Sequence, residues 1–201
     1  FGGAIAAALA VNHPQKVAGL LMLAPALYPW PGGGAWYYTV ASLPLAGPLF
    51  SALIVPLFGR LVIDAATRSV FAPNLPPPDY LAQAHAFEAL RPQAFRHNAR
   101  EVVALQNWVR QFSPRFAAST APAVIIAGDA DRVVSPVLHA RRFAQALKNA
   151  ELVSVANLGH KPDHIATDLA IAALEKIAGQ PRDLEAEVLA LEQRIAGDTF
   201  S

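Results

Sequence analysis

The sequence predicts an α/β protein in which a parallel sheet has helices on both faces and a long, mostly helical segment is inserted. Two observations support this class. Short apolar runs bounded by polar residues alternate with helical patterns near both ends of the chain, as expected for strands buried on both faces of a parallel sheet. Residues 26–122 separate the first two such strands, and a segment of that length is too long for a simple crossover.

The composition is that of a folded, apolar-rich protein. Apolar residues make up 54% of the chain and charged residues 15%, against about 25% charged in a typical globular domain. The net charge is +1 with no basic block, so we expect no nucleic-acid partner. There is no cysteine, which excludes disulfides and a cysteine nucleophile in this chain. No spacing of histidine and acidic residues resembles a metal-ligand set, and we expect no metal or organic cofactor.

The chain begins with a glycine turn that leads into an alanine-rich helix, expected over residues 1–12 and buried on more than one side. Residues 17–23 then form a continuous apolar run, which predicts a strand buried on both faces. A glycine turn of this kind should itself follow a strand, and the sequence contains none before Phe1. We therefore expect the chain to begin in mid-motif, with the earlier strands of the sheet missing.

Residues 26–122 mix proline, glycine and aromatic residues with short helical patterns, and the clearest amphipathic helix is expected over 95–112. No formally charged residue occurs from 17 to 59. Repeated prolines and a triple glycine interrupt this stretch, so we do not expect a membrane-spanning helix. Contact of residues 35–59 with a membrane surface is kept as a competing hypothesis.

The alternation of strands and helices resumes after the insertion. Strands are expected at 123–127 and 152–155, and helices at 137–149, 164–178 and, as a charged tail, 182–196. The expected organisation is a core at 1–25, an inserted helical cap at 26–122, the rest of the core at 123–179 and a helical tail at 180–201.

Polar residues follow the second and third predicted strands. Asp129 and Asp131 come directly after the strand at 123–127, and His160 follows the strand at 152–155. Because the carboxyl ends of parallel strands meet at one edge of the sheet, an Asp and a His from these loops can form a hydrogen bond that fixes the imidazole tautomer. The alternative is structural: the aspartates shape a turn or cap a helix, and His160 is an ordinary loop histidine.

Three stretches together resemble the α/β-hydrolase family. Phe1-Gly2-Gly3, with the apolar run to Pro25, resembles the second half of that family's nucleophile elbow, G-x-S-x-G, and the strand after it. Residues 128–134 resemble its acid loop and residues 157–160 its histidine loop. The insertion occurs where the family carries its cap, and the resemblance covers nearly all of the chain up to Gly179.

The resemblance implies a role for individual residues. Asp131, rather than Asp129, would be the acid of the catalytic triad, and His160 would be the general base. The backbone N–H of Phe1 would belong to the oxyanion hole, and the nucleophile would be the residue just upstream of Phe1. His164 is the second candidate for the base.

The implied reaction is acyl transfer: an esterase-like hydrolase acting on a small apolar carboxylic ester or related carbonyl compound, with this chain inactive because it lacks the nucleophile. Serine is favoured, since Asp-type elbows of the family commonly have Trp where this chain has Phe1. One alternative is an Asp-nucleophile epoxide hydrolase or haloalkane dehalogenase, for which Tyr37, Tyr38 and Tyr80 are candidate cap tyrosines. Another is a non-catalytic member of the fold that binds a ligand or a partner.

The cap's apolar content favours an apolar substrate pocket, with simple packing of the cap as the alternative. Four basic residues of the cap, Arg91, Arg96, His97 and Arg100, either meet an acidic group on a substrate or form a solvated helix face, and the second interpretation is favoured. The sequence leaves the oligomeric state open and favours a cytoplasmic location.

Overall fold

The structure is a computed structural model that describes residues 1–32 and 34–199. The chain forms two compact units. Unit 1 comprises Phe1–Tyr28, Val70–Leu75 and the chain from Gln111 onward, and unit 2 comprises Pro29–Ser69 and Pro76–Arg110. The segment expected as a cap, 26–122, therefore includes residues 26–28, 70–75 and 111–122, which belong to unit 1.

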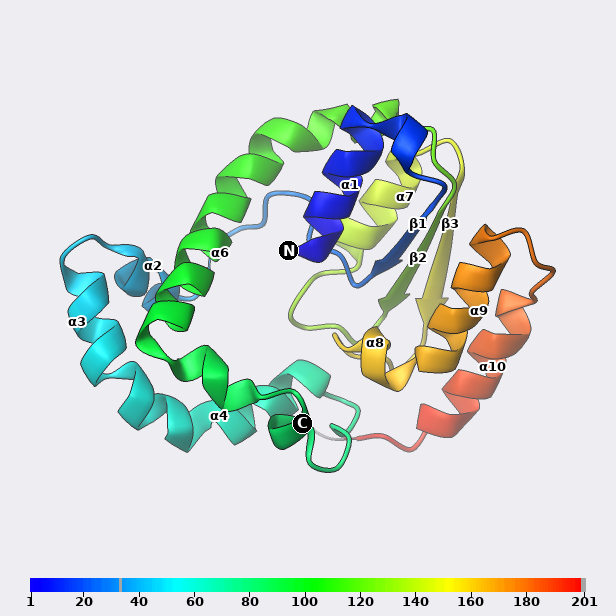
Figure 1. Cartoon of the computed structure of the whole chain (residues 1–201). Helices are drawn as coiled ribbons and strands as arrows, with labels where there is room; N and C mark the ends of the chain where they lie inside the picture. Colours follow the sequence, from blue (N-terminus) through cyan, green and yellow to red (C-terminus); the bar gives the residue numbers. More distant parts are fainter. Residues whose placement is uncertain (33, 200–201) are drawn as a thin grey trace. The chain divides into compact units, whose positions relative to one another are not determined.

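Unit 1 is built on a three-stranded sheet in the order β1-β2-β3 (Figure 1). The strands are β1 (Leu20–Leu23), β2 (Ala123–Gly128) and β3 (Ala150–Val155). Both pairings are parallel, with Leu20 opposite Ala123 and Ala123 opposite Ala150. Every residue of β2 is buried, as the sequence predicted for a central parallel strand.

Helices cover both faces of this sheet. The helices of unit 1 are α1 (Gly2–Asn12), α7 (Arg142–Ala146), α8 (Pro162–Ile165), α9 (Thr167–Ile177) and α10 (Leu184–Ile195), with 3-10 turns at Pro14–Lys16 and Ser113–Ala118 and a π-helical turn at Val137–Arg141. Helices α1 and α7 lie on one side of the strands, and α9 and α10 lie on the other (Figure 1).

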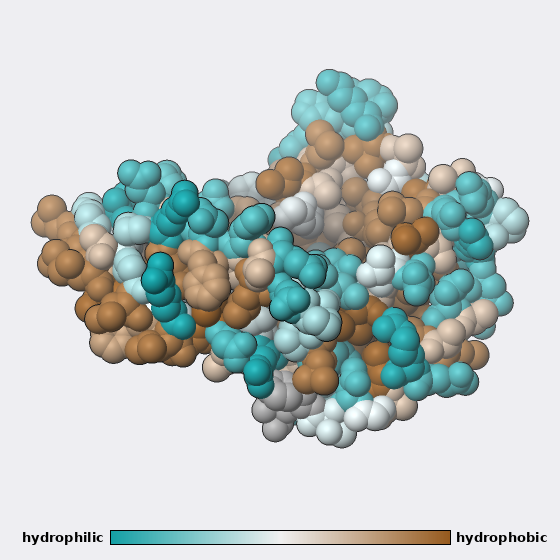
Figure 2. Space-filling model, turned by 60° about the horizontal axis from the view of Figure 1, so that its bottom comes forward, coloured by the Kyte–Doolittle hydropathy of each residue, from teal (hydrophilic) through white to brown (hydrophobic). Residues whose placement is uncertain are grey.

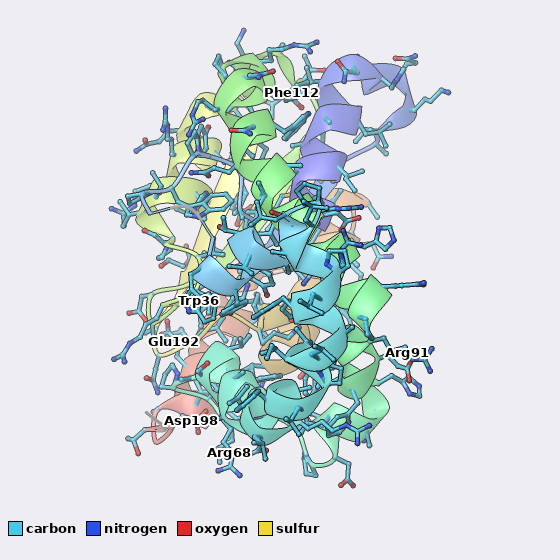
Figure 3. All side chains as sticks on the ribbon, turned by 90° about the vertical axis from the view of Figure 1, so that its left-hand side faces the viewer. Trp36, Arg68, Arg91, Phe112, Glu192 and Asp198 are labelled. Carbon is cyan, nitrogen blue, oxygen red and sulfur yellow. The ribbon has the colours of Figure 1, made fainter. Side chains whose placement is uncertain are left out.

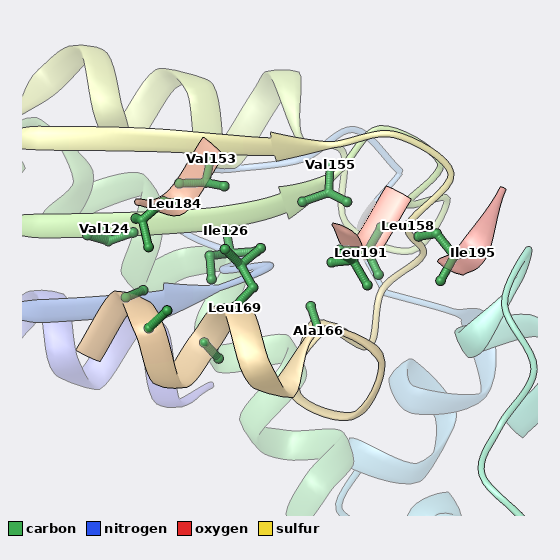
Figure 4. Packing of buried hydrophobic residues seen from close by; sticks show 13 residues of the cluster. Val124, Ile126, Val153, Val155, Leu158, Ala166, Leu169, Leu184, Leu191 and Ile195 are labelled. Atoms are coloured by element: carbon green, nitrogen blue, oxygen red, sulfur yellow. The ribbon is translucent and has the colours of Figure 1, made fainter. Parts of the chain in front are cut away.

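The strands bury alternate side chains on the two faces. Ile126 faces α9, where Leu169 packs against it, and Val153 of β3 lies beside Leu184 of α10 (Figure 4). Helix α10 belongs to the same cluster through Leu184, Leu191 and Ile195, so the charged tail docks on unit 1. The α1–α7 side contains a second group of buried aromatic rings, in which Phe116 meets Phe143 edge to face at 5.2 Å between centroids.

Helix α1 differs from the expectation of burial on more than one side. Only Ala4, Ala7 and Ala10 are buried, whereas Ile5 is 64% exposed and Leu9 44% exposed. The buried positions recur every three residues and have small side chains, which allow the helix to approach the sheet closely. In a helix that is apolar all round, the pattern alone does not indicate which stripe is covered.

The other elements agree with the expected types but differ in their bounds. The first strand is shorter than 17–23, beginning at Leu20. The helix expected at 137–149 is a π-helical turn followed by the five-residue α7, and the helix expected from 164 is divided at Ala166 into α8 and α9.

Unit 2 is helical. Its elements are α2 (Trp36–Ser42), α3 (Ala46–Leu53), α4 (Val55–Phe71), α5 (Tyr80–Gln83), a 3-10 turn (Ala86–Leu90) and α6 (Pro92–Phe112), the last residues of α4 and α6 lying in unit 1. Tyr38 stacks on Phe95 at 5.8 Å and meets Tyr37 at 4.6 Å, and burial raises the pKa of Tyr38. These two tyrosines therefore pack within unit 2.

Helices α3 and α4 expose many large apolar side chains, which gather on the surface in Figure 2. They include Leu49, Leu53, Leu57 and Leu61, and Leu45, directly before α3, is also exposed. In the described part of the chain, no single helix has the length and apolar character to cross a membrane. The α3–α4 pair, bent by 64°, meets that criterion by length and composition only.

The end of β2 provides a test of the fold. A Cβ on Gly128 would overlap the carbonyl oxygen of Leu158, a backbone atom in the loop after β3. We predict that Gly128→Ala lowers the free energy of unfolding by about 1–3 kcal/mol, because the two loops must separate. Gly197→Ala is the control, since nothing lies within 4 Å of a Cβ there. Urea unfolding followed by circular dichroism would contradict the packing if the two variants had equal midpoints.

Candidate active site

The loop after β2 fixes the carboxylate of Asp131. Its Oδ1 accepts hydrogen bonds from the backbone N–H groups of Val133 and Val134, both at 2.8 Å. The side chain is only 2% exposed. Two backbone donors on one oxygen leave the other oxygen, Oδ2, aimed in a fixed direction.

That second oxygen meets the imidazole of His160. Asp131 Oδ2 and His160 Nδ1 are 2.8 Å apart. Because a carboxylate only accepts, Nδ1 carries the hydrogen and donates it, which leaves the lone pair of Nε2 available in the neutral ring. The His160 side chain is 23% exposed, so a reacting group can reach it. The pair has the arrangement of a general base with its orienting acid.

The neighbouring candidates make different contacts. Asp129 Oδ1 accepts from the backbone N–H of Asn157 at 2.8 Å, so this carboxylate joins the two loops. His164 Nε2 lies 3.6 Å from the carboxylate of Asp163, and its ring packs against Phe71. The structure thus places Asp131 and His160 together, and it places Asp129 and His164 in other interactions.

The start of the chain lies at the same edge of the sheet. Phe1 precedes α1, and its carbonyl accepts from the N–H groups of Ala4 and Ile5. A Cβ on Gly3 would lie 3.0 Å from the side chain of Pro25, which follows the carboxyl end of β1. The first residues of α1 therefore lie beyond the carboxyl end of β1, as the acid and histidine loops lie beyond β2 and β3. The oxyanion-hole role of Phe1 stays a prediction.

Helix α10 and the residues just after it form hydrogen bonds with the histidine loop. The Asn157 side chain donates to the carbonyl oxygens of Ile195 at 2.6 Å and Asp198 at 2.9 Å, and Ala156 N–H donates to Glu192 at 2.7 Å. Figure 3 labels Glu192 on α10 and Asp198 just after it. The sequence predicted a helical tail, but no pattern in it indicated that this helix reaches the histidine loop.

A buried histidine next to the acid loop was also not predicted. His139 Nδ1 accepts from the backbone N–H groups of Leu27 and Tyr28, both at 3.1 Å, so its hydrogen is on Nε2. Burial lowers the pKa of His139 to about 4, with Arg142 also lowering it and Asp131 acting in the opposite direction. This ring joins the segment after β1 to the helical turn that follows the acid loop.

The basic residues considered for substrate binding all lie in unit 2. Arg91 pairs with Glu88 at 2.7 Å, whereas Arg96 Nε is buried and without a hydrogen-bond partner. His97 and Arg100 are exposed. Within the described residues, no group of three or more His, Cys, Asp or Glu side chains is placed to hold a metal ion.

Comparison with known proteins agrees with this architecture. The family described as serine aminopeptidase, S33 matches residues 1–162, a range that includes Phe1, Asp131 and His160. A search of curated proteins by sequence found no match.

Several solved structures are similar to the chain. They include an α/β-hydrolase from a Medee basin deep-sea metagenome library (TM-score 0.57, 16% identity, 90% of this chain and 63% of that one). A putative lipase from Acinetobacter baumannii AYE has a TM-score of 0.59 at 20% identity, covering 96% and 59%. A haloalkane dehalogenase loop variant from Bradyrhizobium elkanii has a TM-score of 0.61 at 21% identity, covering 92% and 65%.

These likenesses confirm the predicted fold class. At such identities they show the fold alone, and not a substrate or a mechanism. The chain spans 63%, 59% and 65% of the lengths of these three structures.

The pKa of His139 leads to a prediction about acid stability. The unfolded chain takes up a proton on His139 near pH 6.5, whereas the folded chain does so only near pH 4. The neutral His139 ring therefore makes its full contribution to the free energy of unfolding above pH 6.5. This contribution is lost as the pH falls toward 4, which lowers the free energy of unfolding by an amount on the order of 3 kcal/mol. Urea unfolding at pH 7, 5.5 and 4.5 measures this decrease.

The matched control is His139→Gln, which keeps a side-chain acceptor but does not titrate. We expect its stability to fall less over the same range, by about the His139 contribution. Parallel pH dependences for the two proteins would contradict the assignment of His139 as a buried neutral ring.

Proposed function

Because the chain belongs to the serine aminopeptidase S33 family of α/β-hydrolases, we propose that its parent protein hydrolyses a carbonyl substrate with a nucleophile–His160–Asp131 triad. The observation that carries the proposal is the 2.8 Å contact between Asp131 Oδ2 and His160 Nδ1 at the carboxyl edge of the parallel sheet. Ligand and catalytic groups gather at this edge in such folds.

The proposed reaction proceeds in two steps. The nucleophile is the residue before Phe1; its hydroxyl oxygen attacks the substrate carbonyl carbon while His160 Nε2 takes the hydroxyl proton. The proton then passes to the leaving alcohol, and the acyl group stays on the enzyme. Water then attacks the acyl carbon while His160 takes a proton from it, the bond to the nucleophile's oxygen breaks, and His160 returns the proton to that oxygen as the carboxylic acid leaves. The backbone N–H of Phe1 would stabilise the oxyanion in both steps.

Each residue in this scheme has a physical reason for its role. Asp131 keeps the hydrogen of His160 on Nδ1, so the reactive nitrogen is Nε2, and it stabilises the imidazolium when the proton arrives. The two backbone donors to Asp131 hold its carboxylate without needing other side chains. A chain without the nucleophile has no hydroxyl to activate, and we expect it to be inactive.

Serine is the proposed nucleophile, since the family's description names a serine enzyme and Phe1 stands where Asp-type elbows commonly have Trp. An aspartate nucleophile would instead displace halide from a haloalkane or open an epoxide. Release of chloride or bromide without ester hydrolysis would favour that alternative. Binding of a ligand without turnover of any of these substrates would favour a non-catalytic member of the fold.

We propose a small apolar ester or related carbonyl compound as substrate. The support is the apolar character of unit 2, which carries aromatic residues and exposed leucines. The same acyl transfer acts on amides, and the family's description names an aminopeptidase. Parallel assays with p-nitrophenyl butyrate and alanine p-nitroanilide would separate the two substrate classes.

For the parent protein we predict that His160→Ala lowers kcat for p-nitrophenyl butyrate by about 10³-fold or more, because no other base accepts the hydroxyl proton. Asp131→Asn should lower kcat by a similar factor, because an amide nitrogen can donate to Nδ1 and reverse the tautomer. Both variants should keep the wild-type circular dichroism spectrum.

His164→Ala is the matched control, since His164 lies four residues on and makes none of the Asp131 contacts described above. Its kcat should stay within about twofold of wild type. If His160→Ala kept activity while His164→Ala lost it, His164 would be the base and the proposed triad would be wrong.

A further inference from the structure

A short segment in the middle of the insertion, Val70–Leu75, belongs to unit 1 and contacts the histidine loop. It contains Asn74, whose side chain is fully buried. The Asn74 Nδ2 group donates to the backbone carbonyl of Asn157 and to the carboxylate of Asp198, both at 2.9 Å. Its Oδ1 accepts from the N–H of Gly159, also at 2.9 Å. Both amide hydrogens and the oxygen are thus in use.

The backbone of the same segment also reaches the loop. A Cβ on Gly159 would overlap the carbonyl oxygens of Phe71 and Ala72. Only a residue without a side chain allows this approach at position 159. Gly159, the residue before His160, is therefore held by van der Waals contact on one side and by the Asn74 hydrogen bond at its N–H.

We propose that Asn74 is a positioning residue for His160. It fixes the backbone of residues 157–159, and this backbone sets the direction in which the His160 ring meets Asp131. The inference rests on the proposed function, because the ring direction matters for turnover only if His160 is the base. Asn74 touches neither Asp131 nor the imidazole in the contacts described, so its effect passes through the loop.

Removing the Asn74 amide would leave buried groups without partners. The Asn157 carbonyl and the Gly159 N–H would each lose a hydrogen bond, and an unsatisfied polar group away from water is destabilising. The loop can recover these bonds only by moving toward water. Such a movement displaces His160 relative to Asp131 and to a substrate, and misplacement by about 1 Å costs on the order of 10²-fold in rate.

The test measures kcat and KM in the parent enzyme and the Nδ1–H proton resonance of His160 at low field. For Asn74→Ala we expect kcat to fall about 10- to 100-fold, KM to stay within about twofold, and the Nδ1–H resonance to shift or broaden. Asn149→Ala is the matched control, because the Asn149 side chain donates to the Thr120 carbonyl, beside the amino end of β3. It should leave all three quantities unchanged.

Two substitutions that together exchange the side chains of residues 74 and 198 extend the test. Asn74→Asp places a carboxylate beside that of Asp198 and lacks the donor to the Asn157 carbonyl, so we expect a loss at least as large as for Asn74→Ala. Adding Asp198→Asn supplies a donor to the new carboxylate and should recover part of kcat. If Asn74→Ala fails to fold, Asp198→Ala removes a single partner of Asn74 and should still lower kcat several-fold.

The possible results separate this inference from the proposed function. An unchanged His160 resonance and an unchanged kcat in Asn74→Ala would overturn the positioning role, as would a fall in melting temperature alone. Retention of activity in His160→Ala would instead refute the proposed function. The Nδ1–H resonance would then still report whether Asn74 holds the ring against Asp131.

Discussion

The close backbone contact between the loops after β2 and β3 is the constraint on which the site depends. Gly128 ends β2 with no room for a side chain, because the Leu158 carbonyl occupies the position of a Cβ. The Asp129 carboxylate then accepts from the N–H of Asn157 and joins the loops a second time. With the two backbones fixed in this way, the side chains of Asp131 and His160 meet at 2.8 Å. The pairing is a consequence of the sheet's parallel register and of one glycine.

Much of this arrangement could be predicted from the sequence. Strands buried on both faces are continuous apolar runs, and parallel strands carry their carboxyl-end loops to one edge of the sheet, so an Asp and a His from neighbouring loops were expected to meet. The family resemblance added the choice of Asp131 over Asp129. In the structure Asp131 contacts His160 and Asp129 contacts a backbone amide, and the choice of the catalytic acid stays a prediction. The catalytic roles rest on the proposed chemistry.

The supporting residues could not be predicted in the same way. Asn74 lies far along the chain from Gly159, in a proline-rich stretch without a motif, and both of its bonds to the histidine loop go to backbone groups, which carry no sequence signal. His139 has the same difficulty, since two backbone amides of residues 27 and 28 determine its environment. Side-chain-to-backbone bonds across long sequence separations leave no periodic pattern. The covered stripe of α1 was also undetermined, because all of its faces are apolar.

In the proposed mechanism, the Asp131–His160 pair serves a nucleophile placed directly before Phe1. The most direct measurement is reaction of the parent protein with a fluorophosphonate, which forms a covalent bond to an activated serine, followed by mass spectrometry of the labelled peptide. We expect a single adduct on the residue immediately before Phe1, strongly reduced in His160→Ala. An adduct on another residue, or labelling that is equally fast without His160, would contradict it.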